Sequence, residues 1–138
     1  LALAAAQAGR HDLAGEAFDA AMADDAAALA PDYSYTGALV ALAEAAVLIG
    51  DPTRAAAVAP LLEPWAGRWS WVGTCTLGPL DTSRARVAAL CGDLEAAVRA
   101  GDDALASARR LRAPAFVRLA QASFPHRSNG ARGWNHER

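Results

Sequence analysis

Two pairs of adjacent aspartates are the carboxylates in this sequence that could bind a metal or exchange protons: Asp24 with Asp25, and Asp102 with Asp103. Both pairs lie in alanine-rich runs that predict helix. Neighbouring side chains on a helix point about 100° apart and do not converge on one ligand. We therefore predict that both pairs are solvated helix surface.

Three histidines are the remaining candidates for metal or acid–base chemistry. His11 lies in a predicted turn between helices, and His126 and His136 lie in a polar C-terminal segment. No spacing of His and Cys is typical of a zinc site. A phosphate-binding loop needs Lys, which the chain lacks, and the Gly-x-Gly-x-x-Gly, His-Glu-x-x-His, Cys-x-x-Cys and nucleophile-elbow motifs are absent. The sequence predicts a non-enzyme with no catalytic residue, metal site or cofactor.

A cluster of tryptophans offers a binding site instead. Trp65, Trp69 and Trp71 lie close together in the chain, with Arg68 among them. Aromatic rings beside a guanidinium suit a peptide, a nucleotide or another effector. The alternative is packing, in which large side chains fill the space beside a long connection between helix pairs. The sequence favours packing, yet these four residues are where we expect a protein partner or small effector to bind.

Cysteine usage and hydropathy indicate the compartment. Cys75 and Cys91 match no paired-ligand pattern and predict buried, reduced thiols in a cytoplasmic protein, although a disulfide stays open from sequence alone. The longest apolar run, residues 38–49, is interrupted by Glu44 and is too short to span a bilayer. It predicts a buried helix and no membrane segment.

Charge divides the chain into two unequal parts. Residues 1–108 hold 14 acidic residues and six Arg, whereas residues 109–138 hold seven Arg and a single Glu. Residues 125–138 are polar, basic and rich in Gly, which predicts a disordered tail after a helical domain spanning residues 1–124. Such a tail could contact nucleic acid, but it has no amphipathic helix or recognition motif. We expect no direct nucleic-acid contact.

An internal repeat defines the architecture. The hydrophobic fraction is 54%, much of it Ala, the best helix former, which predicts an all-α fold of closely packed helices. A Gly followed by an acid and then by an Ala recurs three times, at steps of 41 and 42 residues. The glycines, acids and alanines that we assign to these helix-hairpin hinges are Gly9, Ala14, Gly50, Asp51, Ala55, Gly92, Asp93 and Ala97.

Each part of the repeat has a physical role in a helix–turn–helix. Gly accepts the left-handed backbone that ends one helix. Asp caps the next helix, and the small Ala lets the two helices approach closely. The apolar spacing predicts about seven helices, joined by a long connection over residues 66–78, that stack as a tetratricopeptide-like solenoid. The expected helices span residues 1–8, 12–29, 34–49, 52–65, 79–91, 94–112 and 114–123.

The repeat resembles tetratricopeptide repeats, with a longer step than usual. Several stretches are more specifically similar to the C-terminal helical region of bacterial LuxR-type (MalT-like) transcriptional regulators and of adenylate/guanylate-cyclase-associated ATP-binding proteins. The chain departs from this pattern at Arg112, where Gly is usual, and after Ser123, as a truncation or frameshift would produce. The stretches that carry the resemblance are residues 48–51, 60–68, 72–74, 88–97 and 110–115.

The resemblance implies a function for the chain as part of a longer protein. In that family an ATPase module and a DNA-binding or cyclase domain lie outside the helical repeats, which receive an inducer or partner. None of their motifs is present here, and Leu1 is not a start Met. We therefore expect a non-catalytic interaction or sensor fragment of a cytoplasmic bacterial signal-transduction or transcription regulator. The alternative is a stand-alone tetratricopeptide-like protein–protein adaptor.

Overall fold

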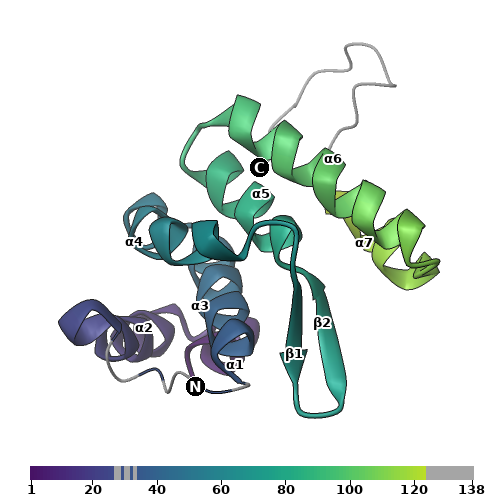
Figure 1. The fold of residues 1–138 in the computed structure, drawn as a ribbon. Helices are drawn as coiled ribbons and strands as arrows, with labels where there is room; N and C mark the ends of the chain where they lie inside the picture. The colour runs from purple at the N-terminus through teal and green to yellow at the C-terminus, as the bar shows by residue number, and fades with distance from the viewer. Residues whose placement is uncertain (27–28, 30–31, 33, 124–138) are drawn as a thin grey trace.

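The fold is mostly helical, with helices close to the expected positions (Figure 1). The computed structural model describes residues 1–26, 29, 32 and 34–123. The predicted tail, residues 125–138, and its His126 and His136 lie outside the described residues. The elements are α1 (Ala2–Gln7), α2 (His11–Ala26), α3 (Tyr35–Ile49), α4 (Pro52–Leu62), the 3-10 helix η1 (Glu63–Trp65), β1 (Trp69–Val72), β2 (Cys75–Pro79), α5 (Leu80–Leu90), α6 (Leu94–Arg110) and α7 (Pro114–Ser123).

The purely all-α prediction is wrong for the connection between α4 and α5. β1 and β2 form a two-stranded antiparallel hairpin, which extends away from the helices in Figure 1. Its strands contain aromatic and β-branched residues, which favour extended backbone. The strands are joined by the two residues between Val72 and Cys75, and Gly73 adopts the positive φ (58°) that tight hairpin turns favour.

The three predicted glycine hinges are confirmed as turns with the same geometry. Gly9, Gly50 and Gly92 have φ of 72°, 75° and 84°, in the left-handed region. At each turn the N–H of the residue after the Gly donates to a carbonyl five residues back, as in the Schellman motif that ends helices. The alanines that follow are buried: Ala14, Ala55 and Ala97 are 0%, 0% and 3% exposed.

The predicted aspartate caps are confirmed in the second and third repeats. The Asp51 carboxylate accepts from the backbone N–H groups of Thr53 and Arg54, and the Asp93 carboxylate accepts from that of Ala96. In the first repeat Asp12 lies inside the first turn of α2 rather than before it. There its charge faces the positive end of the helix dipole.

The helices pack in consecutive pairs, and the first helices of the pairs also pack on one another. α1 packs on α2, α3 on α4, and α5 on α6, while α3 also contacts both α1 and α5. One apolar cluster runs from α1 to α5 and makes these contacts continuous. None of the helices in the described part of the chain is long and apolar enough to cross a membrane. The largest fully buried apolar side chains are Phe18, Leu39, Leu62, Leu80 and Val58.

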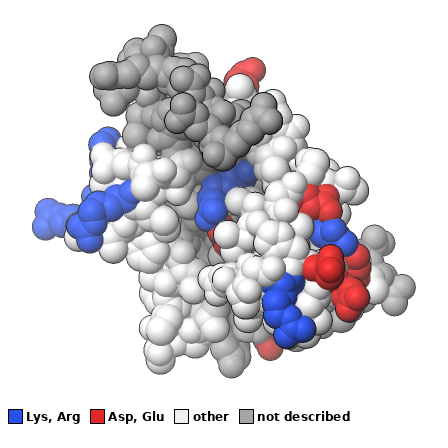
Figure 2. All heavy atoms as spheres, turned by 180° about the vertical axis from the view of Figure 1, so that it is seen from behind, with Lys and Arg blue, Asp and Glu red and all other residues white. Residues whose placement is uncertain are grey.

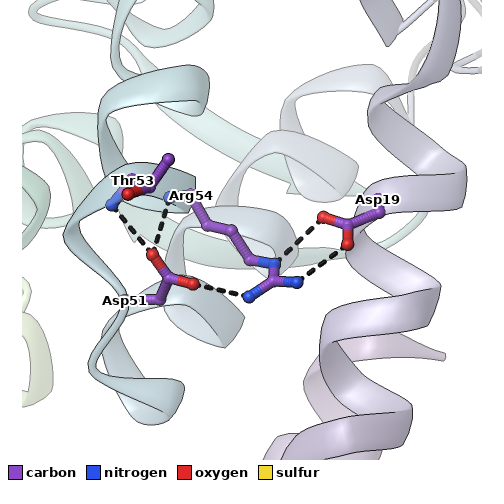
Figure 3. A network of polar contacts seen from close by, with 4 residues as sticks. All are labelled: Asp19, Asp51, Thr53 and Arg54. Atoms are coloured by element: carbon purple, nitrogen blue, oxygen red, sulfur yellow. Dashed lines mark hydrogen bonds and ion pairs between the residues drawn. The ribbon is translucent and has the colours of Figure 1, made fainter.

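An ionic network ties the second hairpin to the first (Figure 3). The Arg54 guanidinium on α4 donates to the Asp19 carboxylate on α2, at 2.8 and 3.0 Å, and to Asp51 at 2.5 Å. The hydrogen bond from Arg54 lowers the pKa of Asp19. The backbone N–H of Arg54 lowers that of Asp51, with smaller contributions from Thr53 and the guanidinium, while burial opposes the shift. The repeat acid at this hinge therefore both caps a helix and orients the arginine.

Replacing Asp51 by Asn should lower the urea midpoint of unfolding at pH 7 and have little effect in acid. A carboxyl whose pKa is lower in the folded state stabilises the fold above its unfolded value, about pH 4, and the contribution disappears as pH falls through the folded-state pKa. Urea titrations of wild type, Asp51→Asn and Asp12→Asn from pH 7 down to about pH 2.5 measure this. If the urea midpoint of Asp51→Asn stayed below that of wild type by the same amount at every pH, the prediction would be contradicted.

Candidate functional site

The four predicted site residues surround one hollow between the base of the β-hairpin and the start of α3. The hollow has a volume of about 560 Å³. η1 supplies Trp65, the turn after it supplies Arg68, and β1 supplies Trp69 and Trp71. We call this site the aromatic hollow; its lining residues are Asp32, Thr36, Trp65, Arg68, Trp69 and Trp71.

Two of the tryptophans are anchored by neighbouring helices. The Trp69 Nε1–H donates to the Ser107 Oγ of α6 at 2.9 Å, and its ring meets Phe116 of α7 edge-on at 5.2 Å. The Trp65 ring lies 5.9 Å from that of Tyr35 on α3. Such contacts fix ring orientation as well as bury area. The packing interpretation therefore holds for these two side chains, which form rigid walls of the hollow.

Trp71 differs from the other two. It is 52% exposed, and no aromatic ring of the described residues pairs with it. Its backbone N–H points to the Thr36 Oγ1 at 3.4 Å, so the strand position is set by α3 while the indole stays open to solvent. The exposed indole is large and apolar, and Trp is enriched among the residues that contribute most to binding at protein interfaces.

The turn that carries Arg68 is held from both sides. The Arg68 N–H donates to the carbonyl of Trp65 at 3.1 Å, and the Arg68 carbonyl accepts from Leu80 at 3.0 Å. One residue earlier, Gly67 has a φ of 72° and donates its N–H to the buried carboxylate of Asp81 at 3.0 Å. The guanidinium of Arg68 makes no hydrogen bond or ion pair within the part of the chain that the structure describes. A fixed backbone thus presents an arginine side chain at the hollow.

Asp32 and Thr36 are lining residues that the sequence did not indicate. The Asp32 carboxylate accepts from the hydroxyl and the backbone N–H of Ser34, at 2.6 and 2.7 Å, and these hydrogen bonds lower its pKa. The wall formed by Thr36 depends on close packing of β1 against α3. The two elements approach at Gly37, where a Cβ would collide with Val72. Nothing in residue spacing predicts this approach, because it joins segments about 35 residues apart.

The hollow offers side chains that could hold a ligand. Tryptophan faces bind apolar or cationic groups, and Arg68 and Asp32 offer one charge of each sign. The pairing of a nucleophile with a base that covalent catalysis requires is absent from the described lining residues. The arrangement fits a side chain or small molecule with an apolar or ring-shaped body and polar ends.

The other candidates for chemistry are dispersed. No three His, Cys, Asp or Glu side chains of the described residues converge as a metal site would require. His11 is exposed at its turn, and Asp102 and Asp103 are exposed on α6, while the side chains of Asp24 and Asp25 lie outside the described residues.

The expectation of buried cysteines is wrong. Cys75 and Cys91 are both free and exposed. Cys75 directly follows the hairpin turn, and Cys91 ends α5 next to its glycine hinge, so neither thiol faces the core.

The comparisons with known proteins bring no relative to this fold. No protein-family model, curated protein or solved structure matches the chain.

Proposed function

We propose that this chain is a non-catalytic helical-repeat module that binds a protein partner or small effector in the aromatic hollow. The half-exposed Trp71, beside two tryptophans fixed by packing, is the observation that carries the proposal. Rigid walls lower the entropy cost of binding, because little side-chain freedom is left to lose. An exposed indole then supplies the apolar area that a ligand would cover.

The repeated turns support the finer assignment to a tetratricopeptide-like solenoid. Three left-handed glycine hinges recur at similar steps, and α3 contacts both α1 and α5. Stacking of first helices on first helices is what a solenoid requires. Together with the resemblance noted above, this supports a cytoplasmic sensor or interaction segment of an ATP-dependent bacterial signal-transduction or transcription regulator, in which binding would alter how the repeats pack on neighbouring domains.

Replacing Trp71 by Ala should weaken binding at the hollow while costing little stability. A half-exposed Trp contributes less than a buried one, so we expect a loss of about 1 kcal/mol in the free energy of unfolding rather than the ~3–5 kcal/mol of a core Trp. Peptides selected against the wild-type chain from a random library should bind Trp71→Ala at least about tenfold more weakly. Fluorescence anisotropy measures the affinity, and urea denaturation measures the stability.

Leu77→Ala is the matched control, because Leu77 is also on the hairpin and is 44% exposed. It should leave the affinity of the selected peptides within about twofold of wild type. If Trp71→Ala instead unfolded at a much lower urea concentration and bound the peptides as tightly as wild type, the ring would be a packing residue and the proposed site would be wrong.

A further inference from the structure

Some arginines of the described residues pair with carboxylates, whereas others, such as Arg68, do not. Four of them, on α4, α5 and α6, each pair with one or two carboxylates: Arg54, Arg84, Arg86 and Arg99. The arginines near the α6–α7 turn have no such partner among the described residues. Residues 104–123 contain no acid at all, although the chain has more acidic than basic residues. Figure 2 shows the contrast. Basic side chains (blue) project from one edge without acidic neighbours, whereas on the opposite side acidic (red) and basic side chains lie next to one another.

Three of these unpaired arginines line a second hollow, of about 480 Å³, at the α6–α7 turn. Apart from these three arginines, the lining residues are apolar. We call this site the arginine hollow; it is lined by Arg109, Arg112, Ala113, Pro114, Val117 and Arg118. Arg110 is adjacent in sequence but is not among the lining residues, and its guanidinium donates to the Ser107 Oγ.

Arg112 occupies a backbone position that favours glycine. Its φ is 52°, and its N–H and that of Ala113 donate to Arg109 and Ala108, the same Schellman pattern as at the glycine hinges. Gly9, Gly50 and Gly92 fill the equivalent position at the other three turns. A non-glycine residue in the left-handed region is strained. The turn thus carries an arginine at a conformational cost that the three glycine hinges avoid.

We propose that the arginine hollow binds an acidic peptide segment of a partner protein, at a site separate from the aromatic hollow. Three unpaired guanidinium groups would hold carboxylates through charge-assisted, bidentate hydrogen bonds. The apolar lining from Pro114 and Val117 favours a peptide with interspersed apolar side chains over nucleic acid, whose phosphates and sugars would leave that surface uncovered.

The test uses the full chain and a fluorescein-labelled peptide of 12 residues that alternates Glu and Leu, at low salt, by fluorescence anisotropy. Arg109→Gln and Arg118→Gln should each weaken binding about tenfold, because each removes a charge-assisted contact. Arg112→Gly should weaken binding similarly and yet raise the Tm by about 4 °C, because Gly accepts positive φ without strain. Higher salt should weaken binding further.

Arg99→Gln is the charge-matched control, since it removes one positive charge from the exposed surface of α6 outside the hollow. This variant, and a double variant Arg127→Gln with Arg132→Gln, should bind like wild type. The proposal is overturned if Arg109→Gln and Arg118→Gln bind like wild type, if a Gln-Leu peptide binds equally well, or if single-stranded DNA of matched charge binds more tightly. It is likewise overturned if the double variant loses binding as strongly as the hollow variants.

Discussion

Replacing Asp81 by Ala is expected to lower the free energy of unfolding by about 3–5 kcal/mol, because it leaves a largely buried arginine without its inner partner. The Asp81 side chain is 1% exposed and accepts from Arg84 at 2.8 Å, while its second oxygen accepts from the Gly67 N–H. Burial lowers the pKa of Arg84, and hydrogen bonds to Glu63 and Asp81 more than offset this, so the net shift is upward. Equilibrium urea denaturation measures the loss.

Glu63→Gln provides the matched control for Asp81→Ala. Glu63 is the second carboxylate of the same arginine, at 2.6 Å, but it is 63% exposed. Exposed ion pairs contribute about 0–1 kcal/mol, so this variant should remain close to wild type. Asp81 also holds the Gly67 turn, so Asp81→Ala should lower the affinity of peptides for the aromatic hollow. Glu63→Gln should leave that affinity unchanged. Equal stability losses in the two variants would contradict the assignment of Asp81 as the buried anchor.

The helices and hinges could be predicted because their determinants are local. A left-handed Gly ends a helix by its own backbone, and an Asp cap acts on N–H groups two or three residues away. The Gly–acid–Ala pattern recurs at Gly9, Gly50 and Gly92, and each copy supports the prediction of a helix-hairpin turn at the others. Asp12 lies two residues past the N-cap position of α2, a distance over which helix ends are intrinsically ambiguous.

The β-hairpin escaped prediction because its stability depends on tertiary contacts. A two-stranded hairpin is marginal alone, and four residues such as Trp69–Val72 give too short a pattern to distinguish a strand from a loop. The hairpin is held by α3 at Gly37 and by the ring of Phe116 on α7, contacts that sequence spacing does not reveal. Gly73, with its positive φ, is the local turn signal in this segment.

The aromatic hollow was predicted in part for a similar reason. Trp65, Arg68, Trp69 and Trp71 lie within seven consecutive residues, so composition alone singled them out. What composition could not give was the division of roles, because that depends on which rings meet Tyr35 or Phe116. The sequence also showed Arg at position 112, where the resembling family usually has Gly. The positive φ of Arg112 shows that this position has the backbone conformation that favours Gly.

Replacing Gly78 by Ala should lower the free energy of unfolding by about 2–4 kcal/mol and loosen the walls of the aromatic hollow. Gly78 has a φ of 99°, and a Cβ there would lie 2.6 Å from Cδ1 and Cε1 of Phe116. The added methyl therefore meets both a strained backbone and the ring that packs edge-on against Trp69. Urea denaturation measures the stability, and indole fluorescence reports the changed environment of the tryptophans.

Gly73→Ala and a double variant separate the two causes of the Gly78 effect. Gly73 has a φ of 58° with open space around its Cβ position, so its replacement reports backbone strain alone, about 1 kcal/mol. In the double variant Gly78→Ala with Phe116→Ala, removing the ring should recover part of the loss, giving a coupling of about 1–2 kcal/mol between the positions. Additive losses would mean that the ring and the new methyl do not meet. Trp69 would then lack the support from α7 and would be held by its hydrogen bond to Ser107 on α6.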